Sequence, residues 1–314
     1  MRKSNFRKAT LSALLMLVVA VVSLTGVTYA WFTSGTQAKV ENINIGVTGA
    51  AGGLQIALDN DQFAFGSSID FADTNNGVTY APVSTSLTAL KEGKFFTAEI
   101  GSTAQKIKNI KAATANTHYF AQSILIDNYG GDAKTIELTG SATCADKETE
   151  LAIRIAIVID GVNKAPTYTA EDKNKYSAEE NKQVYIYEPN ATSHTNAGKN
   201  EAKLDGLAQP EGNQKYKYFG IVKALATGEG APTEISKYSA DDGYLEEVTT
   251  YGMDTASTDK PQISIQAGAV VKATIYVWVE GQDHDCHNDI ASGVVTANLS
   301  LDIKTGGVQP TPGA

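Results

Sequence analysis

The sequence predicts an all-β protein, an antiparallel β-sandwich with polar loop insertions. Apolar and polar residues alternate with period two in many short runs, which is typical of strands that bury one face. Gly, Asn and Asp separate these runs, and no regular amphipathic helix lies between them. Many short strands without intervening helices favour two packed antiparallel sheets.

The alternating runs are expected to be the strands of this sandwich. In chain order they are 40–47, 54–58, 118–127, 134–139, 151–157, 183–188, 215–222, 262–266, 271–280 and 294–303. Polar stretches near 162–214 and 227–261 are predicted to be insertions, the first with one hairpin-like strand and the second with a short helix over 242–251. All strands fall in one predicted domain, 31–303, and the Gly- and Pro-containing tail, 304–314, is predicted to be disordered.

The first thirty residues are predicted to be an export signal. A basic head precedes an uncharged apolar run, 11–24, and a short stretch of small and polar residues. Small side chains at Thr28 and Ala30 predict cleavage between Ala30 and Trp31. The alternative is an uncleaved membrane anchor, which needs roughly 20 apolar residues, and this run is shorter. We therefore expect a secreted protein, extracellular or at the cell surface, with no membrane attachment after cleavage.

Charge and residue content argue against several classes of function. The chain has 26 Lys and Arg against 35 Asp and Glu, and a formal net charge of −9. An acidic surface disfavours nucleic-acid binding. Arg154 is the only arginine beyond the signal, which argues against a bidentate phosphate site. No zinc-peptidase motif or nucleophile motif occurs, so no catalytic residue, enzyme activity or cofactor is predicted.

Cys144 and Cys286 are the only cysteines. An exported pair can form a disulfide, but sequence cannot place two sulfurs together, so a bridge and two separate thiols both stay open. Cys286 also belongs to a dense group of His, Cys and Asp in 283–289, residue types that bind transition metals. Because the group is isolated between two strong strands, a solvated turn with Cys286 packed or bridged explains it better, and no metal site is predicted.

Acidic turn residues offer a second kind of metal ligand. Asp59, Asp61, Asp127, Asp241 and Asp242 could contribute to calcium sites. None of them matches the EF-hand spacing, and acidic turns are common without ions. Ordinary turns are therefore the preferred interpretation.

Three segments resemble a known family. Segment 24–49 (LTGVTYAWFTSGTQAKVENINIGVTG) has a small-residue cut site, an aromatic pair, a polar run and a strand that ends in Gly. In this it resembles the TasA/camelysin family of Gram-positive bacteria, whose precursors are cut by a signal peptidase of the SipW type. Segment 120–138 looks like that family's strand, turn and strand, and 277–286 (VWVEGQDHDC) resembles a motif of surface proteins with this signal class. The resemblance implies a jelly-roll type of sandwich and an extracellular fibre or biofilm-matrix role, and it does not cover the insertions.

The resemblance also implies that copies polymerise by strand donation, a form of β-augmentation. The donor would be the N-terminal segment, which is free only after cleavage. Its expected anchors and groove-filling residues are Trp31, Phe32, Val40, Ile43, Ile45 and Val47. The alternative is an ordinary first strand that pairs within its own subunit, because the alternation is the same in both cases.

The predicted function is therefore a secreted structural protein whose partners are further copies of itself and a SipW-type peptidase. Two rivals stay open. Camelysin-like proteins have been classed as metallopeptidases, although the missing zinc motif argues against that here. A monomeric surface adhesin or glycan-binding module would need exposed aromatics, for which Tyr185, Tyr187, Tyr216 and Tyr218 are the candidates.

Overall fold

The structure is a computed structural model, in which strands dominate the described residues and the two helices found among them, α2 (Leu87–Lys91) and α3 (Lys147–Ala152), are short. It describes residues 38–48, 52–60, 64–71, 79–103, 105–163, 182–190, 217–240, 242–253, 260–283, 286 and 294–304. The all-β prediction is confirmed. The predicted signal and the pair Trp31 and Phe32 lie outside these residues, as does the tail after Lys304. Within the described ranges, neither helix has the length and apolar character needed to cross a membrane.

The first of two six-stranded sheets contains the N-terminal and C-terminal strands. Its order is β15 (Ile263–Ile265), β8 (Lys134–Cys144), β17 (Val294–Lys304), β1 (Ala38–Thr48) and β3 (Ser68–Asp70), with β4 (Thr79–Tyr80) also beside β1. All pairs are antiparallel except β1 and β17, which run parallel. The antiparallel prediction therefore holds for most of this sheet and is wrong at its longest N-terminal pairing.

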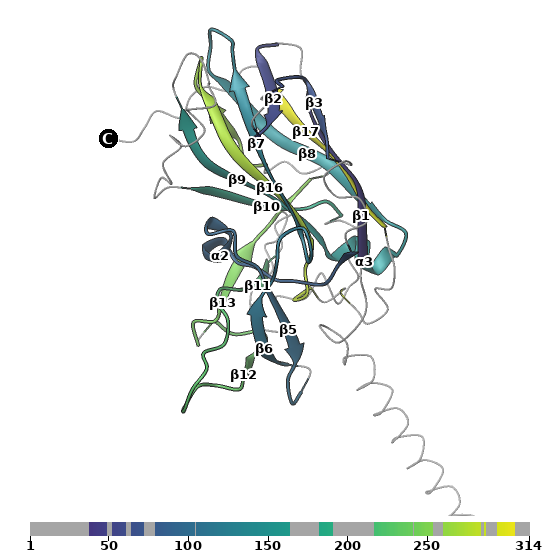
Figure 1. Ribbon diagram of the computed structural model, residues 1–314, viewed down its shortest axis with the longest axis vertical. Helices are drawn as coiled ribbons and strands as arrows, with labels where there is room; N and C mark the ends of the chain where they lie inside the picture. Colours follow the sequence, from purple (N-terminus) through teal and green to yellow (C-terminus); the bar gives the residue numbers. More distant parts are fainter. Residues whose placement is uncertain are drawn as a thin grey trace, which may run out of the picture.

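The second six-stranded sheet is built around β16. Its order is β14 (Tyr251–Gly252), β10 (Gln183–Glu188), β9 (Ile153–Asn163), β16 (Val270–Val279), β7 (Phe120–Asn128) and β2 (Leu54–Leu58). The only parallel pair among them is β10 with β14. We call these two six-stranded sheets the main body (Figure 1).

One hydrophobic core joins the two sheets of the main body. Strand β17 buries alternate residues along its length, as a strand with one inward face does. Ile43, Leu138 and Leu301 of the first sheet belong to the same buried cluster as Ile157 and Ile275 of the second. This shared cluster explains why period-two alternation was the strongest signal in the sequence.

A smaller unit with its own core lies beside the main body. It contains α2, a three-stranded sheet in the order β12 (Glu234–Ser236), β6 (Lys106–Ala112) and β5 (Phe96–Ile100), and the pair β11 (Lys217–Ile221) and β13 (Leu245–Thr249). Its buried residues form a second cluster, which includes Phe96, Ile107, Phe219 and Leu245. We call it the accessory unit; it occupies the lower part of Figure 1.

The predicted insertions are more structured than expected. Strand β10 pairs with β9 as a hairpin-like strand should, but it lies inside the second sheet and buries Ile186 and Tyr187. The helix predicted over 242–251 is wrong, because β13 and β14 occupy that region. Leu245 and Val248 are both buried and stand three residues apart, a spacing that also suits one face of a helix.

Candidate functional site

Strand β1, the predicted donor, lies inside its own subunit. It pairs parallel to β17 from Lys39 to Thr48, and Asn44 to Gly46 also pair with β3. Ile43 and Ile45 are fully buried, Val47 is half-buried, and the backbone of Val40 is part of the strand. Trp31 and Phe32, the predicted anchors, lie outside the described residues. The structure thus has the arrangement of an ordinary first strand.

The two neighbours of β1 differ greatly in length. Strand β17 pairs along almost all of it, whereas β3 is three residues long and β4 is two. Two further backbone bonds cover that edge, from Val47 N to Ser67 O (2.8 Å) and from Phe71 N to Ile43 O (2.9 Å). The described contacts therefore attach β1 mainly through one partner.

Polar side chains reinforce this attachment on the outer face. Asn44 Nδ2 donates to Asn298 Oδ1 at 2.7 Å, and the hydroxyls of Thr48 and Ser300 lie 2.8 Å apart. Asp302 accepts from Thr48, Ser300 and Thr139 and so connects β1, β17 and β8. Each such bond near water contributes modestly, about 0.5–1.5 kcal/mol.

A buried cluster of charges lies where the accessory unit meets the main body. Arg154 of β9 is only 1% exposed, and its Nη2 contacts Asp283 and lies 3.1 Å from Glu188 Oε1. Thr250 donates a further hydrogen bond to Glu188 Oε1 at 2.6 Å. The guanidinium carbon also lies 5.8 Å from the ring centre of Tyr218 in β11. Arg154 therefore pairs with two buried carboxylates from different elements, and its one positive charge balances one of their two negative charges.

Glu280 is the third buried acid of this cluster. It is 0% exposed, accepts from Trp278 Nε1 at 2.9 Å and from the amide of Gln282 at 3.0 Å, and is hydrogen-bonded by Ser84. Ser84 in turn exchanges two backbone hydrogen bonds with Phe96 and accepts from the amide of Ile221. Ser84 thus links the end of β16 to both sheets of the accessory unit.

Segment Val83–Ser86 carries these links, and we call it the bridging segment. The amide of Val83 donates to Val279 O at 3.0 Å, and Val83 O accepts from the amide of Gly281 at 2.9 Å. Val83 is thus bonded to the residues on either side of Glu280. Thr85 O accepts from the hydroxyl of buried Tyr218 at 3.0 Å. Gln282 adds side-chain bonds to the carbonyls of Phe219 and Lys237. The arrangement fastens the accessory unit to the main body through buried polar contacts.

The interpretation of 281–289 as a solvated turn is wrong for its described part. Gln282 and Asp283 are buried, and Gln282 bonds to the carbonyl of Phe219 in β11, whereas Cys286 is packed in the large core, as that interpretation allowed. His284, Asp285 and residues 287–290 lie outside the described residues. Two sequence signals pointed to this site, the lone Arg154 within an apolar strand and Glu280 directly after a long apolar one.

The ionisation of Glu280 should make stability depend on pH. Burial raises the pKa of Glu280 from the usual 4.5 to about 7. The stability contributed by this group is therefore complete below about pH 4.5 and is lost as pH rises to about 7, a change on the order of 3 kcal/mol. We expect Glu280→Gln to remove this loss. In urea unfolding, the free energy of unfolding of the variant should therefore rise relative to that of the wild type between pH 4.5 and 7.5.

The exposed Glu229 supplies the matched control for this prediction. Glu229→Gln changes the net charge equally but involves no buried group, so its difference from the wild type should stay constant over the same pH range. A constant difference for Glu280→Gln would contradict the prediction.

The two cysteines are separate buried thiols in the structure. Cys144 ends β8, and its amide donates to Glu150 at 2.9 Å, while Cys286 is fully buried in the large core cluster. Burial raises the pKa of both thiols. A protonated, buried thiol is a poor nucleophile and metal ligand.

Two of the acidic turn residues, Asp59 and Asp127, pair with protein groups. Asp59 lies 2.6 Å from Lys272 Nζ, and Asp127 accepts from Gln55 Nε2 at 2.7 Å. Asp61 and Asp241 lie outside the described residues. In the part of the chain that the structure describes, no three His, Cys, Asp or Glu residues are grouped to hold a metal ion.

The aromatics proposed for an adhesin are mostly core residues. Tyr187 and Tyr218 are 0% and 2% exposed, and Tyr185 is half-buried; Tyr216 lies outside the described residues. Their expected exposure is therefore wrong for Tyr187 and Tyr218. Comparison with family models, curated proteins and solved structures finds no match to this chain.

Proposed function

We propose that this chain is a secreted structural protein of the TasA/camelysin type, a jelly-roll-like β-sandwich that forms extracellular fibres or biofilm matrix after removal of residues 1–30. Its partners are further copies of itself, joined by donation of β1, and a SipW-type peptidase frees the donor. The observation that carries this proposal is the position of β1. It begins at Ala38, soon after the predicted cut, and is attached mainly through β17.

Exchange of β1 between copies keeps the same contacts. A donated β1 would bury Ile43 and Ile45 against the neighbour's β17 in the register they now have in their own subunit. Exchange of an identical element costs little enthalpy, and it creates polymers when each copy both gives and receives. When the local concentration of chains is high, mass action favours insertion of β1 into another copy over its insertion into its own subunit.

The timing of export would favour the open form. Before cleavage the signal would hold the N-terminus at the membrane, so β1 could not close easily onto its own β17. Once released, β1 would find either its own subunit or the exposed edge of another. Opening a closed subunit would expose Ile43 and Ile45 and break the β1–β17 ladder, so the choice made at release would persist.

A disulfide between β1 and β17 should block assembly. Asn44 and Asn298 are register partners with touching side chains, so Asn44→Cys with Asn298→Cys places two thiols within reach of each other. We expect the oxidised, mature double variant to stay monomeric and the same sample to form fibres after reduction. Electron microscopy and sedimentation before and after adding a thiol reductant make the measurement. The disulfide leaves Ile43 and Ile45 in the core, whereas deletion of β1 would remove them.

Thr143→Cys with Thr296→Cys is the matched control, because these register partners lock β8 to β17 and leave β1 free. It should form fibres whether oxidised or reduced. Fibres from chains whose Asn44–Asn298 disulfide is intramolecular, as non-reducing gel electrophoresis shows before assembly, would refute donation of β1.

A further inference from the structure

The apolar face of β1 does not by itself fix the register of β1 on β17. In the present register the inward-facing residues of the two strands stand opposite each other in the pairs Ile43 with Ala297, Ile45 with Leu299 and Val47 with Leu301. A slide of two residues keeps the faces of a strand, because side chains alternate with period two. If β1 slid by two residues toward the end of β17, Val47 would stand opposite Ile303 and every inward pair would still be apolar. On the other side of β1, Ile43 would replace Ile45 opposite Ile69 of β3.

The asparagine pair on the outer face does not exclude the slide either. Asn44 Nδ2 donates to Asn298 Oδ1 at 2.7 Å in the present register. The slide would set Asn42, another asparagine, opposite Asn298. Asn44 would take the place of Gly46, where a Cβ would stand 3.5 Å from Ser67 O, an ordinary contact. Both registers are therefore compatible with this part of the outer face.

Asp302 is the residue that distinguishes the two registers. The hydroxyls of Thr48 and Ser300 both donate to its Oδ1, and the hydroxyl of Thr139 donates to its Oδ2. Ser300 lies on β17 itself and Thr139 lies on β8, so these two donors keep their places when β1 moves. After the slide, Gly46 would stand opposite Asp302 in place of Thr48. The carboxylate would then lose one of its three hydroxyl donors, and bonds to a charged acceptor are the stronger ones.

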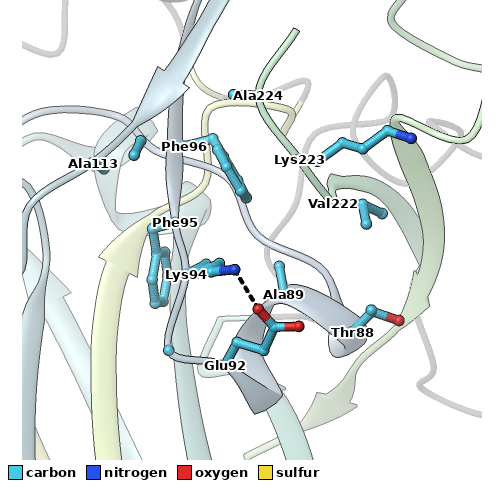
Figure 2. A pocket seen from close by; sticks show the side chains of 12 residues that line it. Thr88, Ala89, Glu92, Lys94, Phe95, Phe96, Ala113, Val222, Lys223 and Ala224 are labelled. Carbon is cyan, nitrogen blue, oxygen red and sulfur yellow. Dashed lines mark ion pairs between the residues drawn. The ribbon is translucent and has the colours of Figure 1, made fainter. Parts of the chain in front are cut away.

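Among the described residues, the hollow of the accessory unit is not a comparable groove for a strand. It has a volume of about 490 Å³ and lies between α2, the start of β5 and the segment after β11, as Figure 2 shows. Its apolar walls Phe95, Phe96 and Ala89 are only 1–4% exposed, and its lining also includes the ion pair of Lys94 and Glu92. A strand would therefore bury little apolar surface there, whereas beside β17 the inward face of β1 is buried.

We propose that Asp302 selects the strand that is accepted beside β17, namely β1 of a further copy in the register that places Thr48 opposite Asp302. The inference rests on the proposed strand donation and adds to it the residue that determines which strand is accepted. A strand with the same apolar alternation but no hydroxyl at this position would bind less tightly. Because a slide of two residues would displace neighbouring copies by roughly 7 Å, selection of one register gives a fibre with a uniform repeat.

Two pairs of introduced cysteines report the register. Asn44→Cys with Asn298→Cys stands directly opposite in the present register, whereas Asn42→Cys with Asn298→Cys stands directly opposite only after the slide. The mature chain, residues 31–314, is assembled in reduced form and then placed in a glutathione redox buffer. The oxidised fraction of each pair then measures the population of its register. Non-reducing gel electrophoresis separates disulfides within one chain from disulfides between chains.

Variants of Thr48 test whether its hydroxyl sets the register. Thr48→Val removes the hydroxyl and nearly keeps the shape of the side chain. It should raise the ratio of slid to present-register disulfide roughly 10-fold, as expected for one lost hydrogen bond to a charged group. Thr48→Ser keeps the hydroxyl and should give the wild-type ratio. Circular dichroism checks that each variant is folded.

Thr139→Val is the matched control, because it removes a different hydroxyl from Asp302 on a strand that does not move with β1. It should leave the ratio unchanged. A ratio that Thr48→Val leaves unchanged, or that Thr139→Val raises equally, would overturn this inference and leave strand donation standing. Disulfides found only within single chains, together with an absence of fibres, would overturn strand donation and with it the selection of a partner by Asp302.

Discussion

Replacing Arg154 with methionine should destabilise the protein by about 3–5 kcal/mol, because the change removes the cation that pairs with two buried carboxylates. Asp283 and Glu188 are 0% and 1% exposed, so water cannot replace the guanidinium. Arg154 also donates to the carbonyls of Leu151 and Ile153 at 3.2 Å, which anchors the end of α3. Urea unfolding at pH 7.5 measures the effect.

Lys147→Met provides the matched control, because it removes the same charge from an exposed ion pair with Glu150. Its cost should be roughly 0–1 kcal/mol. A triple variant that also carries Glu188→Gln and Asp283→Asn should recover part of the stability lost by Arg154→Met. Equal costs for Arg154→Met and Lys147→Met would show that the cluster contributes little to folding.

Gly220→Ala should separate the accessory unit from the main body. A Cβ on Gly220 would stand 2.0 Å from Thr85 O, 2.8 Å from Thr85 C and 2.9 Å from Ser86 Cα. All three are backbone atoms of the bridging segment, so no side chain can move aside to relieve the clash. We expect a loss of about 3 kcal/mol or more. Faster hydrogen exchange in β5, β6 and β11 than in β16 would show that the accessory unit loosens first.

Gly131→Ala is the control for this glycine effect. A Cβ there meets nothing within 4 Å, and its φ is not in the left-handed region. It should be neutral or stabilising by roughly 0.4–1 kcal/mol, through a less flexible unfolded chain. Wild-type stability of Gly220→Ala would mean that the bridging segment can shift away from β11.

Strands that bury one face against the large core were predictable from sequence. The alternation of β17 reflects a packing environment that repeats every two residues, whereas β16 is buried at nearly every position and is apolar over most of its length. The bounds of both strands agree closely with the expected ones. Strand β6 was missed because Lys106, Lys108 and Lys111 dilute its apolar pattern, and β5 because its alternating run is only five residues long and packs on a small core. A local pattern also cannot reveal that β1 pairs parallel to β17, because these two strands lie near opposite ends of the sequence.

The polar site was less accessible to sequence reasoning. Charged residues next to a turn are usually solvated, but Glu280 and Asp283 are buried where the main body meets the accessory unit, with Asp283 paired to Arg154 and Glu280 bonded by Trp278. That unit is assembled from segments far apart in the sequence, such as Phe96 and Phe219. Burial of this kind depends on tertiary contacts that no local pattern records.

The parallel pairing of β1 and β17 has a mechanical consequence. The chain enters this pair at Ala38 and leaves it at Lys304, at opposite ends of the two strands. Tension between the two termini would therefore slide the strands past each other and load the hydrogen bonds from Asn42 to Thr48, which follow the register shift after Val40, together. An antiparallel terminal pair would instead peel apart one bond at a time. A subunit linked to its neighbours through its ends would resist pulling through shear, which suits a material that bears load.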